Sequence, residues 1–252
     1  MVVVDVGKIF KSLEEKMYSI NFDKNRFCIY DDGRYISGGS FSLWEGGPDY
    51  ILIMSIYDSL INLCEGVMYS FCEIVKINPS EYLLDYNPLL QEDENERIAR
   101  HHTENMIFRT STIWGMLAQF CNQLWGAGYE IDSIYVRKFF ERESKHEAHC
   151  GFSKKVINYF DEEDSVETDQ EIWKGNHQYV EEYRNAMTHR LSPSSVIISK
   201  ETNDLRPPVV FLLKRVIEDY VQSISFFDVI LDEFNSELRK GKKVQPPGFE
   251  PG

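Results

Sequence analysis

The stretch that decides the fold is YILIMSIYDSLINLCEGVMYSFCEIV, residues 50–75. Apolar side chains recur along it at spacings of three and four residues, the repeat of one helix face. They are Ile53, Tyr57, Leu60, Cys64, Val67, Phe71 and Val75. Asp58, Asn62, Glu65 and Glu73 interrupt the stretch. A membrane span would not tolerate that many charges, so we expect a buried helix of a soluble protein.

Three further apolar stripes predict three more long helices. Gly126 ends the second helix, and Pro207-Pro208 starts the last one, because proline is tolerated in a first turn. The long helices are expected at residues 50–76, 92–125, 166–190 and 208–239, and shorter ones at 134–141 and 152–160. Four long amphipathic helices favour an all-α fold, an antiparallel helical bundle.

The chain divides into three parts by composition. Residues 1–48 form a small N-terminal extension, in which Asp31-Asp32-Gly33 is a hairpin turn signal between two short strands. Residues 49–240 form the bundle. The Pro/Gly-rich tail at 241–252 is expected to be disordered. Within the bundle, the acidic run 161–164 is expected to be a solvated loop.

Composition limits the class of protein. With 42% hydrophobic residues in 252, the chain can bury a substantial core. The net charge of −14 argues against a surface that is broadly coated with nucleic acid, so any RNA contact needs a local basic patch. The five cysteines are scattered and odd in number, and Met1–Asp5 is too short an apolar run for a signal peptide. We infer a cytoplasmic protein with no membrane association.

The residues best suited to chemistry are in YRNAMTH, residues 183–189. Asn185 and His189 are four residues apart and share a helix face, and Arg184 lies on its flank. Histidine can transfer protons near neutral pH, and the arginine fork can neutralise a phosphate or a pentavalent phosphorus. Because RNA carries its own 2′-hydroxyl nucleophile, such a group could cleave it without a metal or another cofactor.

This motif resembles that of the HEPN family (higher eukaryotes and prokaryotes nucleotide-binding). The family has an Arg-polar-x-x-x-His motif at the end of the third helix of a helical bundle. Many members are metal-independent RNases that serve as toxins or in antiviral defence. Others are inactive partners of nucleotidyltransferases. The resemblance covers residues 49–240 as a pattern of helices.

The resemblance implies a role for each motif residue. Arg184 would stabilise phosphate charge, Asn185 would assist, and His189 would act in proton transfer. It also implies a homodimer, in which two motifs face each other, and an antitoxin or a nucleotidyltransferase as a possible protein partner. Members modified by nucleotidyltransferases often carry a tyrosine two residues after the histidine. Leu191 stands there, so that modification is not supported.

The spacing alone is not specific. An arginine followed shortly by a histidine also occurs at 97–102 and 142–149. Only Arg184 is followed by an amide, and only His189 lies where a long helix ends before a proline. A non-catalytic HEPN-like module that binds a nucleotide or a protein, and a structural protein with an accidental motif, therefore remain alternatives to an endoribonuclease.

Other residues have two interpretations. Arg97, His101 and Arg109 share one face of the second helix, and with Arg190 they are candidate substrate-binding residues that could grip phosphates. The alternative is a solvated face paired with Glu94, Glu96 and Glu104. His146 and Cys150 have helical metal-ligand spacing around His149, but a structural zinc site needs about four ligands and no matching pair occurs elsewhere. We therefore expect no metal.

Overall fold

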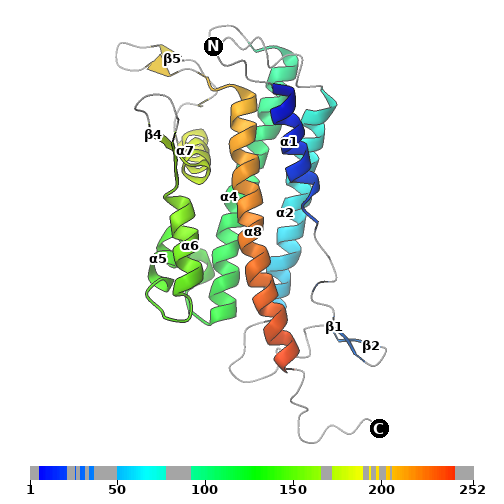
Figure 1. Cartoon of the computed structure of the whole chain (residues 1–252), viewed down its shortest axis with the longest axis vertical. Helices are drawn as coiled ribbons and strands as arrows, with labels where there is room; N and C mark the ends of the chain where they lie inside the picture. Colours follow the sequence, from blue (N-terminus) through cyan, green and yellow to red (C-terminus); the bar gives the residue numbers. More distant parts are fainter. Residues whose placement is uncertain are drawn as a thin grey trace, which may run out of the picture.

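Three long helices run side by side along the molecule (Figure 1). They are α2 (Tyr50–Lys76), α4 (Glu94–Trp125) and α8 (Val209–Gly241). The structure is a computed structural model that describes residues 6–21, 26, 29–31, 34–36, 50–77, 92–165, 172–189, 193, 197–198, 203–204 and 206–241. In this part of the chain only two-stranded hairpins accompany the helices. The prediction of an all-α helical bundle is confirmed.

The helix directions differ from a simple antiparallel order. α2 runs opposite to α4, as expected, but α4 and α8 run in the same direction (Figure 1). Near the starts of both, Arg100 donates a hydrogen bond to the carbonyl oxygen of Pro207. Further along, Phe120 and Phe227 meet edge to face, 6.0 Å between ring centroids. The parallel pairing is possible because the elements between α4 and α8 carry the chain back to the start of the bundle.

Local signals explain the ends of α4. Asp93 is extended and its side chain accepts a hydrogen bond from the backbone N–H of Glu96, which caps the helix. At the other end Gly126 adopts a left-handed conformation, with φ 61°, and its N–H bonds back to the last turn. Helix length and position therefore follow from residues next to the helix ends.

The first helix, α1 (Val6–Tyr18), packs on α8. Its side chains Phe10, Leu13 and Met17 are buried in the same hydrophobic core as those of the long helices. Lys16 adds an ion pair with Glu218 of α8 at 2.8 Å. This part of the expected N-terminal extension thus contributes to the bundle core.

The shorter helices lie beside the C-terminal half of α4 (Figure 1). They are α5 (Val136–Glu143) and α6 (Cys150–Phe160), preceded by the 3-10 helix η2 (Ile131–Ser133). Trp125 at the end of α4 stacks on Phe139 of α5, with ring centroids 6.0 Å apart. Both helices were predicted from the sequence to within two residues at each end.

Three hairpins connect the helices. The first joins β1 (Ile29–Asp31) to β2 (Arg34–Ile36) around the predicted turn, with Asp31 opposite Arg34. The others pair β3 (Glu163–Ser165) with β4 (Ile172–Lys174) and β5 (Ile197–Ile198) with β6 (Asn203–Asp204). The acidic run was predicted as a loop, and its last two residues are instead paired in β3. The tail at 242–252 lies outside the described residues.

The third predicted helix begins ten residues later than expected. It is α7 (Asn176–His189), because residues 172–174 form β4 instead of a helical turn. Gly175 makes this junction possible: its N–H donates to the carbonyl oxygen of Glu162 at 2.9 Å. A Cβ on residue 175 would come within 2.3 Å of that oxygen, so only glycine fits there.

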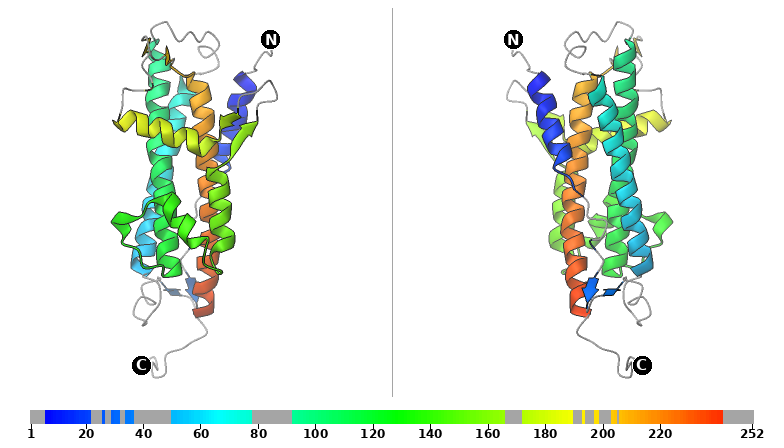
Figure 2. Two further views of the ribbon diagram at one scale, coloured as in Figure 1. Left: turned by 90° about the vertical axis from the view of Figure 1, so that its left-hand side faces the viewer. Right: turned by 90° about the vertical axis from the view of Figure 1, so that its right-hand side faces the viewer.

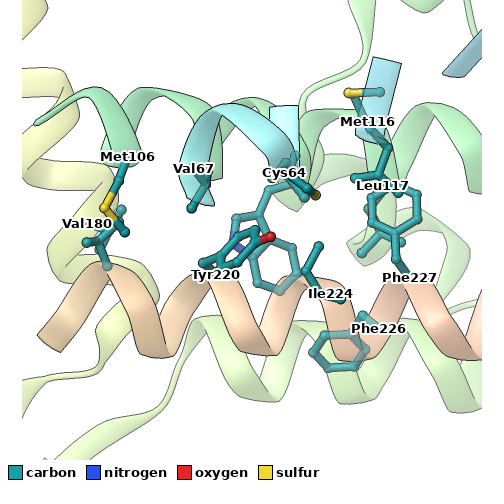
Figure 3. Close-up of a cluster of buried hydrophobic side chains, with 14 of the residues drawn as sticks. Cys64, Val67, Met106, Met116, Leu117, Val180, Tyr220, Ile224, Phe226 and Phe227 are labelled. Atoms are coloured by element: carbon teal, nitrogen blue, oxygen red, sulfur yellow. The ribbon is translucent and has the colours of Figure 1, made fainter. Parts of the chain in front are cut away.

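The core lies between α2, α4 and α8, and α7 closes it at one end (Figure 3). Cys64 and Val67 of α2 face Tyr220 and Ile224 of α8. Burial raises the pKa of the Cys64 thiol to about 12, which keeps it protonated. Among the described residues, no helix combines the length and the apolar character that crossing a membrane requires.

Candidate functional site

The helix that carries the motif crosses the bundle instead of running along it. In Figure 1 α7 is viewed nearly end-on, and in Figure 2 it lies across α4 and α8. Its C-terminal end reaches past α4 (Figure 2, left). Arg184 and Asn185 are in the penultimate turn and His189 is its last residue. The motif thus lies at the projecting end of a helix, outside the core between the long helices.

Each motif residue has a different environment. Arg184 is half-buried, and its Nε is buried with no hydrogen-bond partner among the described residues. Asn185 is exposed. For His189 the structure describes only the backbone, and Arg190 lies outside the described residues. The hydroxyl of Thr188 donates to the carbonyl oxygens of Arg184 and Asn185, at 3.2 and 3.1 Å. These hydrogen bonds stabilise the last turn of α7.

Contacts with α4 fix the place where α7 crosses. The hydroxyl of Tyr183 donates to Oε1 of Glu104 at 3.2 Å. Val180, one turn earlier, lies beside Met106 (Figure 3). Burial raises the pKa of both Tyr183 and Glu104, so both favour the neutral form more than they would in water. The motif therefore follows directly after a buried contact with α4.

The predicted substrate-binding residues of α4 share one face, as the sequence suggested. Arg97 and His101 are exposed, and Arg109 is half-buried. The Nδ2 of Asn105 and the Nε2 of His101 are 3.1 Å apart. Arg109 donates from Nη1 to the backbone oxygen of Asn105 at 3.2 Å. These contacts stay within α4, and none of them neutralises the arginine charges.

Glu96 and Glu104, which could neutralise these basic residues, contact other side chains instead. Glu96 pairs with Arg100 at 3.4 Å and with Arg206 at 3.5 Å. Glu92 pairs with the same two arginines, both of which are buried. Glu104 accepts from Tyr183. Two of the three glutamates expected to pair with the exposed basic residues are therefore engaged with other side chains.

As a result, three arginines near the crossing have no carboxylate partner in the part of the chain that the structure describes. Among the described residues no ion pair joins Arg97, Arg109 or Arg184 to an acidic side chain. In a chain with a net charge of −14, this is an unusual local arrangement. These arginines are the candidates for the local basic patch that RNA binding would require.

A second polar group, which the sequence did not reveal, is buried at the other end of α7. Asp219 of α8 is fully buried. Its carboxylate accepts from the indole N–H of Trp114 at 3.1 Å and from the hydroxyl of Tyr159 at 3.0 Å. The Nδ1 of His177 lies 3.2 Å from it, and the His177 ring stacks on Phe160. Asp219 therefore joins α4, α6, α7 and α8 at one point.

Only a weak signal for this group exists in the sequence. Asp219 interrupts the apolar stripe of α8 between Ile217 and Tyr220, a position where a charge needs buried partners. The partners themselves come from three other helices and have no common spacing. Sequence periodicity therefore marks the acid but cannot identify its donors.

The predicted weak metal candidates are arranged in a different way. His149 lies 2.7 Å from Glu143, Nδ1 to Oε2, and its ring stacks on Trp125 with centroids 4.3 Å apart. The rings of His146 and His149 are 6.1 Å apart. Over the described ranges, no group of three or more histidine, cysteine or acidic residues could hold a metal ion.

Comparison of the chain with protein-family models, with curated proteins and with solved structures gives no match. The resemblance to the HEPN family therefore depends on Arg184, Asn185 and His189 and on the helical bundle that carries them. Function has to be argued from the geometry around the end of α7.

Proposed function

We propose that the chain is a HEPN-like, metal-independent endoribonuclease whose site is the C-terminal end of α7. The observation that carries the proposal is the buried Nε of Arg184, which has no hydrogen-bond partner in the described part of the chain. A buried donor without an acceptor costs about 1–3 kcal/mol, more when it is charged, so such groups call for an explanation. A bound phosphate oxygen would complete the hydrogen bonds of this guanidinium.

The proposed reaction uses the substrate's own nucleophile. The 2′-oxygen of a ribose attacks the adjacent phosphorus while His189 removes its proton. The bond from phosphorus to the 5′-oxygen breaks, and that oxygen takes a proton from a histidine or from water. The products are a 2′,3′-cyclic phosphate and a 5′-hydroxyl. Arg184 stabilises the charge that develops on phosphorus, and Asn185 positions the substrate.

The surrounding surface supports this assignment. Arg97 and Arg109 have no carboxylate partner in the described part of the chain and flank the α4 face next to the crossing. Each can contact a phosphate of the same strand, and His101 adds a donor between them. An acidic protein can hold RNA in this way, since the basic groups are gathered at one place.

The proposal extends to assembly and setting. We propose a homodimer in which two copies of His189 face a shared cleft, acting in the cytoplasm as a toxin or a defence factor. An antitoxin or a nucleotidyltransferase is the proposed protein partner. Cys64, Cys72, Cys121 and Cys150 are free thiols, as expected in a reducing compartment. Light scattering at micromolar concentration tests the dimer.

Incubation of the purified protein with mixed RNA in EDTA tests the reaction. Wild type should generate 2′,3′-cyclic phosphate ends, and His189→Ala should be slower by about 100- to 10,000-fold, the usual effect of losing an acid–base group. Arg184→Lys should also fail, because a point charge does not replace a planar fork. DNA should stay intact. His146→Ala, at an exposed histidine away from α7, is the matched control and should cleave like wild type.

Cleavage that is equal in His189→Ala and wild type would contradict the proposal. If wild type cleaves no RNA but still binds it, the alternative of a non-catalytic HEPN-like binding module takes its place. Circular dichroism of each variant shows whether a loss of activity reflects a loss of folding.

A further inference from the structure

A row of aromatic and imidazole rings crosses from α2 onto the exposed face of α4. Tyr69 of α2 is 62% exposed, although it lies among buried neighbours of the helix stripe. Its ring meets that of His102 edge to face, 6.4 Å between centroids. The rings of His102 and His101 are 5.4 Å apart. These contacts hold the first ring of the row, that of Tyr69, at the surface.

Buried surroundings make His102 a neutral member of this row. Burial, together with the neighbouring charges of His101 and Arg109, lowers the pKa of the His102 imidazole. Its Nδ1 is buried without a hydrogen-bond partner in the described part of the structure. The ring therefore contacts Tyr69 and His101 edge to face, as an uncharged neighbour of both.

The side chain of Arg109 packs against α2 on the same surface. It lies across α2 at Gly66, where a Cβ would come within 2.5 Å of its Nε. The backbone oxygen of Asn105 accepts from its Nη1. The absence of a side chain at residue 66 thus leaves room for the guanidinium at the edge of the ring row.

The row continues toward the end of α7. Phe108 is 40% exposed and lies one helical turn from Glu104, which contacts Tyr183 of α7. Arg97 is exposed on the same side of α4. Glu73, one turn after Tyr69, pairs with Lys76 at 2.6 Å. Exposed rings, and arginines with no carboxylate partner among the described residues, thus lie on α4 between its contacts with α2 and with α7.

We propose that a single strand of RNA is bound across this face of α4, with unpaired bases stacked on Tyr69 and Phe108 and its phosphates held by Arg97 and Arg109. The inference deepens the proposed function and rests on it for the choice of RNA. Stacking requires bases that are free of a duplex, because a paired base offers no open face to a side-chain ring. Arginines without carboxylate partners are free to bind phosphates.

The test measures binding by fluorescence anisotropy with a labelled RNA of about 12 nucleotides. The parent is His189→Ala in EDTA, so that the strand stays intact. Tyr69→Ala should weaken binding by about 5- to 150-fold, the effect of losing one stacked base. Tyr69→Phe keeps the ring and should bind like the parent. Tyr135→Ala removes a tyrosine that is 71% exposed and lies outside this face, and this variant should also bind like the parent.

A separate measurement tests the proposed contacts between the arginines and the phosphates. Arg109→Ala should weaken binding and reduce the slope of log Kd against log salt by about 0.7, the value for one phosphate contact on a single strand. A duplex of the same sequence should bind more weakly than the strand. Single-stranded DNA should bind like RNA, since stacking and phosphate contacts do not use the 2′-hydroxyl.

Equal binding by Tyr69→Ala and Tyr135→Ala, or duplex binding as tight as single-strand binding, would overturn the inference. No binding of RNA by the parent would overturn it as well, and would favour a protein as the occupant of this face. The two proposals fail separately. Tyr69-dependent binding without cleavage by wild type rejects only the nuclease, whereas cleavage that does not depend on Tyr69 rejects only this surface.

Discussion

Replacing Asp219 by alanine should destabilise the protein more than any exposed charge change. Three donors converge on this carboxylate, from Trp114, Tyr159 and His177, at 3.1, 3.0 and 3.2 Å. Asp219 itself has no exposed surface, and the side chain of His177 is only 12% exposed. The substitution would leave all three donors without their acceptor in a place where water has little access.

The expected cost follows from these burials. An unsatisfied buried donor costs about 1–3 kcal/mol, and breaking a buried charged group's contacts costs about 3–5 kcal/mol in total. We therefore expect Asp219→Ala to lower the free energy of unfolding by about 3–5 kcal/mol. Asp219→Asn keeps one acceptor oxygen and should cost about 1–2 kcal/mol. Because His177 anchors the first turn of α7 to Asp219, both variants should also reduce the proposed RNA cleavage by the motif at the other end of that helix.

Urea unfolding followed by circular dichroism measures the loss. The matched control is Asp228→Ala on the same helix, whose carboxylate pairs with Arg26 at 2.7 Å but is 54% exposed. A surface pair of this kind contributes less than about 1 kcal/mol. If Asp219→Ala lowers the free energy of unfolding no more than Asp228→Ala does, the buried hydrogen bonds to Asp219 do not stabilise the packing of the four helices.

Two further predictions concern the α2–α4 face and the carboxyls. Gly66→Ala should leave stability unchanged or raise it by up to about 1 kcal/mol, since alanine favours a helix. It should weaken RNA binding nonetheless by displacing Arg109, and an unchanged Kd would contradict this. Burial raises the pKa of Glu104, so its ionisation costs stability as pH rises; Glu104→Gln should gain stability over wild type in urea melts between pH 4 and 7. Glu218 is the opposite control: burial opposes its ionisation, but Lys16, Lys214 and Asn176 together outweigh burial and lower its pKa. Glu218→Gln should therefore become less stable than wild type as pH rises over that window.

The positions of most helices could be predicted from the sequence because apolar periodicity is a local property. α2, α4 and α8 begin and end within two residues of the predicted bounds. The motif residues Arg184 and Asn185 were also placed near the end of a helix, as the structure has them. In each case the deciding residues lie within a few turns of one another, so that spacing alone carries the information.

The start and the direction of α7 were decided by tertiary structure. Residues 172–174 pair as a strand with residues 163–165, which shortens the helix predicted there. The helix then crosses the bundle because Tyr183 contacts Glu104 of α4 and His177 contacts Asp219 of α8. Contacts between residues so far apart in the chain leave no periodic signal in the sequence.

Which charged residues of the α4 face form ion pairs could likewise not be predicted from spacing in the sequence. From spacing alone, Arg97 is expected to pair with Glu94, which lies three residues earlier on the helix, or with its neighbour Glu96. In the structure Glu96 turns to Arg206, which lies more than a hundred positions later in the chain and is brought beside it by the fold. By itself, then, the sequence determined the positions of α2, α4 and α8 and predicted which residues could act on phosphate. The fold alone decided which arginines are paired, because a charge that loses its water needs a partner, and Arg100 and Arg206 are buried against Glu92 and Glu96. Among the described residues, Arg97 and Arg184 have no such carboxylate partner.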